Sequence, residues 1–148
     1  MKNSIIIFLC VFITACTKKD PIKKLDINQS LIAISNKVNL DTAGTQKIQF
    51  CELVHFKDWD KMIIIPPYLP WEMLEKQQID NLHQLKDSII YKTLNDSKCT
   101  LLFLRDNKIT AYAVVDRMPI DFAEPFYNDK IPKPVLKDML CKIGRAHV

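Results

Sequence analysis

Glycine is scarce in this sequence, and long apolar runs are absent. Only Gly44 and Gly144 occur among the 148 residues, which excludes collagen-like repeats and nearly excludes the glycine-rich loops that bind nucleotide phosphates. No apolar run reaches the roughly 20 residues that a membrane-spanning helix needs. The 48% of hydrophobic and 26% of charged residues are typical of a chain with a globular core. The length allows one domain after any targeting segment.

Metal-ligating and nucleophilic motifs are lacking as well. The histidines form no HExxH motif, no two cysteines form a CxxC pair, and no serine lies in a nucleophile-elbow pattern. We therefore predict no metal ion, no cofactor and no catalytic residue set of these kinds. The net charge of +4 provides no basic patch of the strength that nucleic-acid binding requires, so no nucleic-acid partner is predicted.

The first 15 residues have the pattern of an export signal. Lys2 precedes the apolar run Ile5–Ala15, whose length matches the hydrophobic region of a secretory signal peptide. The run ends in Ile13-Thr14-Ala15-Cys16, which resembles the lipobox of bacterial lipoproteins. This resemblance implies cleavage after residue 15, a diacylglyceryl group on the sulfur of Cys16 and an acyl chain such as palmitate on its amino group. It therefore implies a lipid-anchored protein of the bacterial cell envelope.

Residues 16–30 are predicted to be the lipidated cysteine and a flexible tether, because they are polar, contain Pro21 and show no clear period. Thr17 stands where the inner-membrane retention signal of enteric bacteria has Asp. This difference favours the periplasmic face of the outer membrane in a host that has one. Four lysines of the segment either attract anionic lipid or belong to a solvated spacer: Lys18, Lys19, Lys23 and Lys24.

The last six residues, 143–148, have the sequence IGRAHV. One choice of codons for them reproduces a common short-read sequencing adapter, whose flanking bases also complete the codon of Lys142 and supply a stop after Val148. We therefore expect these residues to be adapter sequence and the natural chain to be cut near Lys142. They are excluded from the predictions of fold and site. Without residues 1–15 and 143–148, the net charge falls from +4 to +2.

Residues 31–142 are predicted to form a single α+β domain, truncated at its end. Alternation over Lys47–Glu52 predicts a half-buried strand, and Lys61–Ile65, closed by two prolines, predicts a strand covered on both faces. Apolar segments between Thr100 and Val115 flank Asp106-Asn107. Because Asp and Asn tolerate positive φ, these segments predict an antiparallel hairpin.

Helical spacing of apolar residues predicts a helix from Trp71 to about Lys76 and a short amphipathic helix after Pro134. Together these elements predict a small antiparallel sheet of four to five strands, including the Thr100–Val115 hairpin. One or two helices are expected on one face of that sheet.

Three segments resemble a family of small uncharacterised bacterial lipoproteins and secreted proteins. They are Trp59-Asp60-Lys61 with the later Pro67-Tyr68, Leu102-Phe103 with Asp106-Asn107-Lys108-Ile109, and Arg117 with Asp121-Phe122. The match covers Lys47 to Phe122. The resemblance implies a fold and an exported location, and it implies no catalytic role for any residue.

The cysteines of the domain allow two interpretations. Cys51 and Cys99 lie in or at the start of predicted strands, and an exported domain meets an oxidising compartment. Either these two residues form a disulfide, or Cys51, Cys99 and Cys141 are buried thiols that pack as small apolar residues.

Aromatic and charged residues gather at the two ends of the predicted strand Lys61–Ile65. They form a candidate binding surface: Trp59, Asp60, Lys61, Tyr68 and Trp71. The alternative is that the aromatic rings cap the core and hydrogen-bond through their polar tips. Asp60 with Lys61, or Arg117 with Asp121, also provide charges for an acid–base site, although paired surface charges are the alternative.

The predicted function is a non-enzymatic binding module of the envelope, with an inhibitor or immunity protein as a specific variant. Its predicted partners are the membrane, through the lipid on Cys16, and another envelope protein. The alternative is an envelope enzyme or enzyme accessory that uses Asp60 and Lys61 or Arg117 and Asp121. A structural component of the envelope is a third class, which an exposed apolar patch or sheet edge would favour.

Overall fold

The computed structural model describes residues 21–37, 46–47, 50–93, 95–118, 133–142 and 145–146. The predicted signal peptide, Cys16 and Asp121 lie outside these ranges. The predictions that concern them therefore stay predictions.

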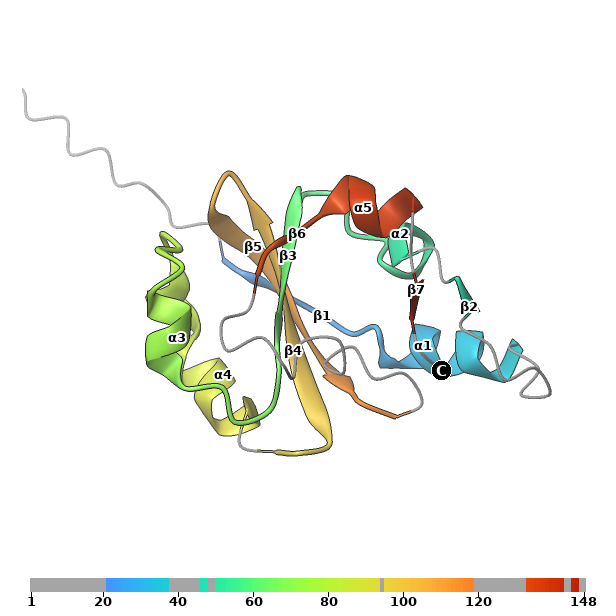
Figure 1. Ribbon diagram of the computed structural model, residues 1–148, viewed down its shortest axis with the longest axis horizontal. Helices are drawn as coiled ribbons and strands as arrows, with labels where there is room; N and C mark the ends of the chain where they lie inside the picture. Colours follow the sequence, from blue (N-terminus) through green and yellow to red (C-terminus); the bar gives the residue numbers. More distant parts are fainter. Residues whose placement is uncertain are drawn as a thin grey trace, which may run out of the picture.

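A five-stranded mixed sheet forms the centre of the domain, with the strand order β1-β5-β4-β3-β6 (Figure 1). The strands are β1 (Lys23–Leu25), β3 (Lys61–Ile65), β4 (Lys98–Arg105), β5 (Lys108–Asp116) and β6 (Val135–Leu136). Neighbouring strands are antiparallel except β1, which pairs parallel with β5. The predicted α+β class is confirmed, and the parallel pairing of β1 is the part that the sequence did not indicate.

The predicted hairpin is the β4–β5 pair. Asp106 and Asn107 form its two-residue turn with φ of 49° and 64°, the conformation that matches the twist of the flanking strands. Thr110 is an extra residue in β5, because Phe103 pairs with Ala111 and Leu104 with Ile109. Such a bulge re-aims the side chain at its position.

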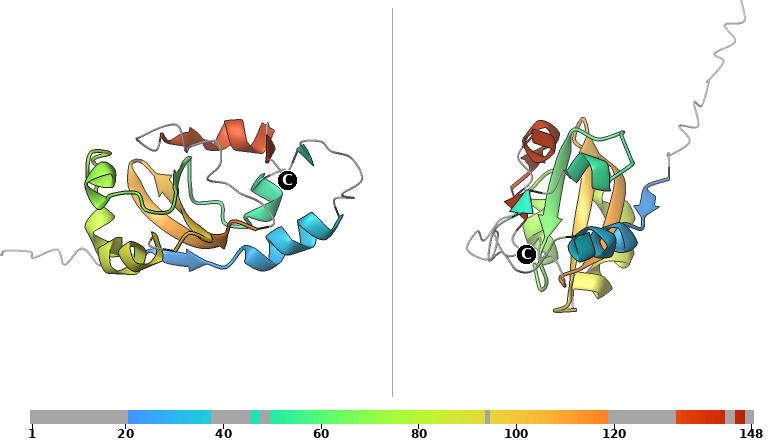
Figure 2. Two further views of the ribbon diagram at one scale, coloured as in Figure 1. Left: turned by 60° about the horizontal axis from the view of Figure 1, so that its bottom comes forward. Right: turned by 90° about the vertical axis from the view of Figure 1, so that its right-hand side faces the viewer.

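Helices cover both faces of the sheet, whereas the prediction placed them on one face. On one side lie α1 (Asn28–Lys37), α2 (Phe50–Leu53) and α5 (Lys137–Lys142), and on the other lie α3 (Trp71–Glu75), the 3₁₀ turn η1 (Leu82–Leu85) and α4 (Lys86–Thr93) (Figures 1 and 2). The physical reason lies in β3 and β4, whose residues 62–65 and 99–104 are buried without interruption. Strands that are apolar on both faces need a cover on each side.

The half-buried strand predicted for Lys47–Glu52 is wrong. Gln46–Lys47 forms a two-residue strand, β2, and α2 begins at Phe50. Phe50, Leu53 and Val54 are all buried, and their spacing of three and four residues fits a helical turn rather than a strand. β2 pairs antiparallel with β7 (Arg145–Ala146) in a separate two-stranded sheet.

The domain also begins earlier than the predicted boundary at Leu31. β1 belongs to the sheet, and Ile27 is only 5% exposed. The side chain of Asn28 links this segment to β5, because its Nδ2 donates to the Val114 carbonyl (3.3 Å) and its Oδ1 accepts from the Asp116 N–H (3.1 Å). The tether predicted for residues 16–30 therefore ends before Lys23.

A disulfide joins Cys51 of α2 to Cys141 of α5, with 5.2 Å between the Cα atoms. The predicted bridge between Cys51 and Cys99 is wrong. Because residues 50–53 are helical, Phe50 and Leu53 face the sheet and Cys51 reaches α5 instead. Cys99 is a thiol buried in the core at 2% exposure, which fits the alternative interpretation for that residue.

Candidate binding site

The predicted surface of aromatic and charged residues is divided in the structure. Trp59 is 1% exposed and belongs to the core on the α1–α2 side of the sheet. Its ring packs edge-on against Phe103 (5.4 Å between centroids) and Phe50 (6.2 Å). Its Nε1–H donates to the Phe56 carbonyl at 2.9 Å. Trp59 is thus a core residue with a satisfied polar tip, as the alternative interpretation had it.

Tyr68 and Trp71 lie beyond the other end of β3, away from Trp59. Tyr68 is 59% exposed and has a φ of 59° in the turn that follows Pro67. Trp71 begins α3, packs against the core of the opposite face, and donates from Nε1 to Glu75 (2.7 Å). These two residues and Trp59 therefore belong to no common surface.

Asp60 and Lys61 also have structural partners. Asp60 accepts the Asp106 N–H of the hairpin turn through Oδ2 (3.3 Å), and its backbone binds Leu104 and Lys137. Lys61 is half-buried in β3, where it pairs with Leu104 and Leu136. The Oδ1 atom of Asp60 is buried and accepts no hydrogen bond from the described residues. Asp60 therefore fixes the turn between β4 and β5.

The second predicted charge pair, Arg117 with Asp121, stays a prediction, because Asp121 lies outside the described residues. Arg117 contacts Asp96, with 2.8 Å to its carbonyl and 3.7 Å to its carboxylate. Lys98 pairs with Asp116 (3.0 Å), and Arg105 pairs with Asp58 (3.4 Å). These partly exposed contacts agree with the alternative of paired surface charges.

A groove runs along β1 on the α1–α2 side of the sheet. It consists of a hollow of about 410 Å³ and a second hollow of about 270 Å³, and both are lined by Lys23, Phe56 and Asp58. We call this the β1 groove. One wall is β1, and the other is the segment His55–Asp58 before β3. The Lys23 ammonium on one wall lies 5.6 Å from the centre of the Phe56 ring on the other.

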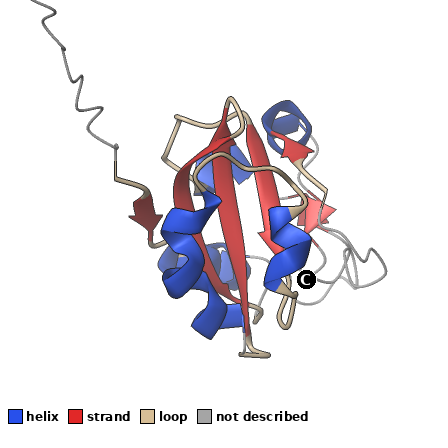
Figure 3. Cartoon of the chain, turned by 90° about the vertical axis from the view of Figure 1, so that its left-hand side faces the viewer, coloured by secondary structure: helices blue, strands red, loops and turns tan. Residues whose placement is uncertain are grey.

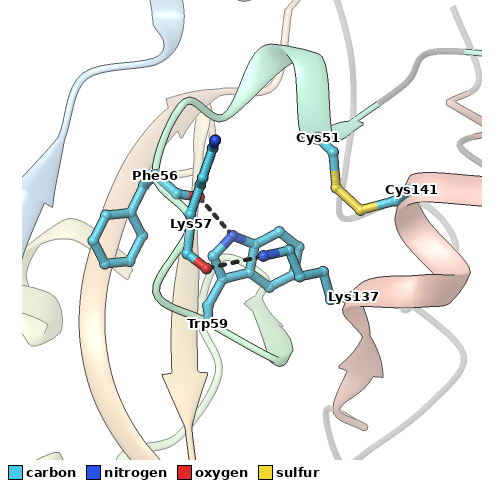
Figure 4. Close-up of a disulfide and its surroundings, with 6 residues drawn as sticks. All are labelled: Cys51, Phe56, Lys57, Trp59, Lys137 and Cys141. Atoms are coloured by element: carbon cyan, nitrogen blue, oxygen red, sulfur yellow. Dashed lines mark hydrogen bonds between the residues drawn. A yellow bond between two sulfur atoms is a disulfide. The ribbon is translucent and has the colours of Figure 1, made fainter.

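Three successive backbone carbonyls of the wall His55–Asp58 accept hydrogen bonds that hold it in place. Trp59 Nε1 donates to the carbonyl of Phe56, Lys137 Nζ to that of Lys57 (2.9 Å), and the bulge residue Thr110 to that of Asp58 (2.6 Å). Figure 4 shows the first two of these bonds beside the disulfide. Because the donors come from three separate parts of the chain, the wall keeps its shape without a partner.

A third hollow, of about 290 Å³, lies beside Lys24 and includes Lys98 and Val114. Val114 packs against the core on the α3–α4 side, so this hollow and the β1 groove flank β1 on opposite faces of the sheet. Neither this hollow nor the β1 groove was predicted from the sequence. The signal was present, because Leu25 and Ile27 alternate with Lys24 and Asp26, the pattern of a short half-buried strand.

Comparison with protein-family models found no match, and searches of the curated proteins and of the solved structures found none either. The resemblance to a lipoprotein family stays a prediction. Among the described residues, no group of three or more His, Cys, Asp or Glu side chains is placed to hold a metal ion. No helix in the described part of the chain is long and apolar enough to cross a membrane.

Proposed function

We propose that this chain is a lipid-anchored protein of the bacterial envelope that binds another envelope protein in the β1 groove. The observation that carries the binding role is the groove wall. Three donors fix consecutive carbonyls of residues 56–58, so the site is formed before a ligand arrives and loses little entropy on binding.

The position of the groove supports the same function. Only residues 17–22 separate Cys16 from β1, and a chain extends by at most about 3.5 Å per residue. A lipid on Cys16 would therefore keep the groove within about 25 Å of the membrane surface, where other envelope proteins are found.

The disulfide supports export. Cys51 and Cys141 are bonded, and disulfides persist mainly in oxidising compartments such as the bacterial periplasm. The enzymatic alternative has less support at Asp60, because that residue binds the hairpin turn.

Two matched histidines test the binding role. His55 lines the β1 groove, His83 lies in η1 on the opposite side, and both are exposed. A photo-crosslinking amino acid at position 55 should give a discrete adduct with a second protein in living cells. The same amino acid at position 83 should give none. Equal adducts from both positions, or no adduct from position 55, would contradict the proposal.

The anchor is tested separately by Cys16→Ser. This variant should leave the membrane fraction and appear with the soluble envelope proteins, because it has no thiol to carry the diacylglyceryl group. Continued sedimentation with membranes would contradict the anchor and leave the groove experiment unaffected.

A further inference from the structure

We infer that β1 receives an extended, acidic strand of the partner, which joins the sheet at its outer edge. This inference rests on the proposed function and specifies how the β1 groove binds and which chemistry it selects.

β1 is an edge strand of the sheet. It is the last strand of the sheet on its side, and no described strand lies beyond it (Figure 3). Lys23 and Lys24 are exposed. An edge strand presents backbone N–H and C=O groups that an added strand can pair with, and this pairing is a recurrent mode of peptide recognition.

The hollows beside β1 are arranged as an added strand requires. Side chains of an extended strand point alternately to the two faces of a sheet. β1 has a hollow on each face: the β1 groove lies beside Lys23, the other hollow lies beside Lys24, and Leu25 lines both. An added strand could therefore place alternate side chains on both faces, which is how strand addition gains specificity.

Lysines predominate along this edge. Five of them line the hollows: Lys23, Lys24, Lys57, Lys98 and Lys108. One of the five, Lys98, already pairs with Asp116. Of the two acidic residues in the groove, Asp26 and Asp58, the second already pairs with Arg105. The edge therefore favours glutamate or aspartate in the incoming strand. A second copy of this chain is disfavoured, because pairing β1 with β1 would place lysines opposite lysines.

The test uses the mature lipidated protein in detergent and two blocked hexapeptides, one alternating glutamate with valine and the other alternating lysine with valine. Binding is measured by fluorescence anisotropy of the labelled peptide, and hydrogen exchange locates the contact. The glutamate peptide should bind and slow amide exchange in the segment 21–27. The lysine peptide should bind at least about tenfold more weakly, as expected for a few exposed charge pairs.

Charge reversal makes the test sharper. The double variant K23E/K24E should lose about tenfold in affinity for the glutamate peptide and should now prefer the lysine peptide. A gain in affinity for the lysine peptide also shows that the variant is folded. The control K76E/K86E changes the net charge equally at exposed lysines near α3 and α4 and should leave both affinities unchanged.

Several results would overturn strand addition. The first is equal affinity for the two peptides, and the second is slowed hydrogen exchange outside β1. The third is slowed exchange of β1 that depends on protein concentration without peptide, which indicates a second copy of the chain. The fourth is slowed exchange of β1 caused by anionic vesicles alone. None of these depends on adduct formation at position 55 or on the release of Cys16→Ser. Failure of strand addition is thus distinguishable from failure of the proposed function.

Discussion

The ammonium group of Lys137 lies 4.9 Å from the centre of the Trp59 ring and donates a hydrogen bond to the Lys57 carbonyl. Trp59 in turn donates to the carbonyl of Phe56. One residue of α5 and one residue of the core thus hold neighbouring carbonyls of the groove wall (Figure 4). Through Cys141, the same helix is bonded to α2.

Replacing Lys137 by methionine should lower the free energy of unfolding by about 1–2 kcal/mol. The variant keeps an aliphatic chain on Trp59 but loses the cation–π contact and leaves the Lys57 carbonyl without its closest donor. Urea unfolding measures the loss, and hydrogen exchange should become faster in residues 55–59. Lys76→Met, at an exposed lysine after α3, is the control. Equal stabilities of the two variants would show that Lys137 does not hold the wall.

Removing the disulfide should have a larger effect. The bond closes a loop with a sequence separation of 90, and the loss of chain entropy in the unfolded state predicts about 4.5 kcal/mol of stabilisation. The double variant C51A/C141A should therefore unfold at a much lower urea concentration. Reductant should destabilise the parent protein by a similar amount and leave the variant unchanged. An effect of reductant on the variant would mean that the stabilisation has another source.

Local patterns were sufficient for β3 and for the β4–β5 hairpin. Pro66 ends the first, and Asp106-Asn107 encodes the turn of the second, so neighbours in sequence determine both elements. α2 has four residues, too few for a period to be evident, and the alternation of Leu25 and Ile27 with Lys24 and Asp26 at β1 covers only two repeats. Their structures depend on burial against the sheet, which a sequence window does not contain.

The β1 groove also depends on contacts between segments that are distant in the sequence. Its wall is held by hydrogen bonds from three residues. Trp59 is next to the wall in the sequence, whereas Thr110 and Lys137 are distant from it. The same holds for Cys51 and Cys141, whose pairing follows from the contact between α2 and α5 rather than from spacing. Trp59 had the right residue type for a binding surface, but its ring is in the core.

Asn81 should be sensitive to the loss of its amide group. It is 4% exposed, its Oδ1 accepts the Ile109 N–H (2.7 Å), and its Nδ2 donates to the Ile109 carbonyl (2.9 Å). Asn81→Ala leaves both backbone groups buried and unpaired, which should cost about 2–4 kcal/mol in urea unfolding. Gln84→Ala, at a half-buried residue of η1, is the control and should cost less than about 1 kcal/mol. Similar losses in the two variants would mean that the Asn81 amide does not stabilise β5.

Asn81→Asp adds a dependence on pH. A buried carboxylate facing the Ile109 carbonyl is repelled, so its pKa in the folded state should rise above the unfolded value of about 4. The protonated acid can still donate to that carbonyl. The variant should therefore be close to the parent in stability below about pH 4 and lose stability as the pH rises from there. The free energy of unfolding of both proteins is measured across this pH range. If the difference between them stays constant to within about 1 kcal/mol, the expectation is contradicted.

The last prediction concerns two adjacent glutamines that follow α3. Gln78 has a φ of 54°, whereas Gln77 is not among the non-glycine residues with positive φ. The left-handed conformation costs a residue with a Cβ atom about 1 kcal/mol, and glycine adopts it freely. Gln78→Gly should therefore raise the free energy of unfolding by up to about 1 kcal/mol, offset in part by the greater freedom of glycine in the unfolded chain. Gln77→Gly only increases the conformational freedom of the unfolded chain, so it should lower the free energy of unfolding by about 0.5–1 kcal/mol. Thermal unfolding of both variants decides the matter, because a loss at both positions would show that the conformation of Gln78 carries no strain.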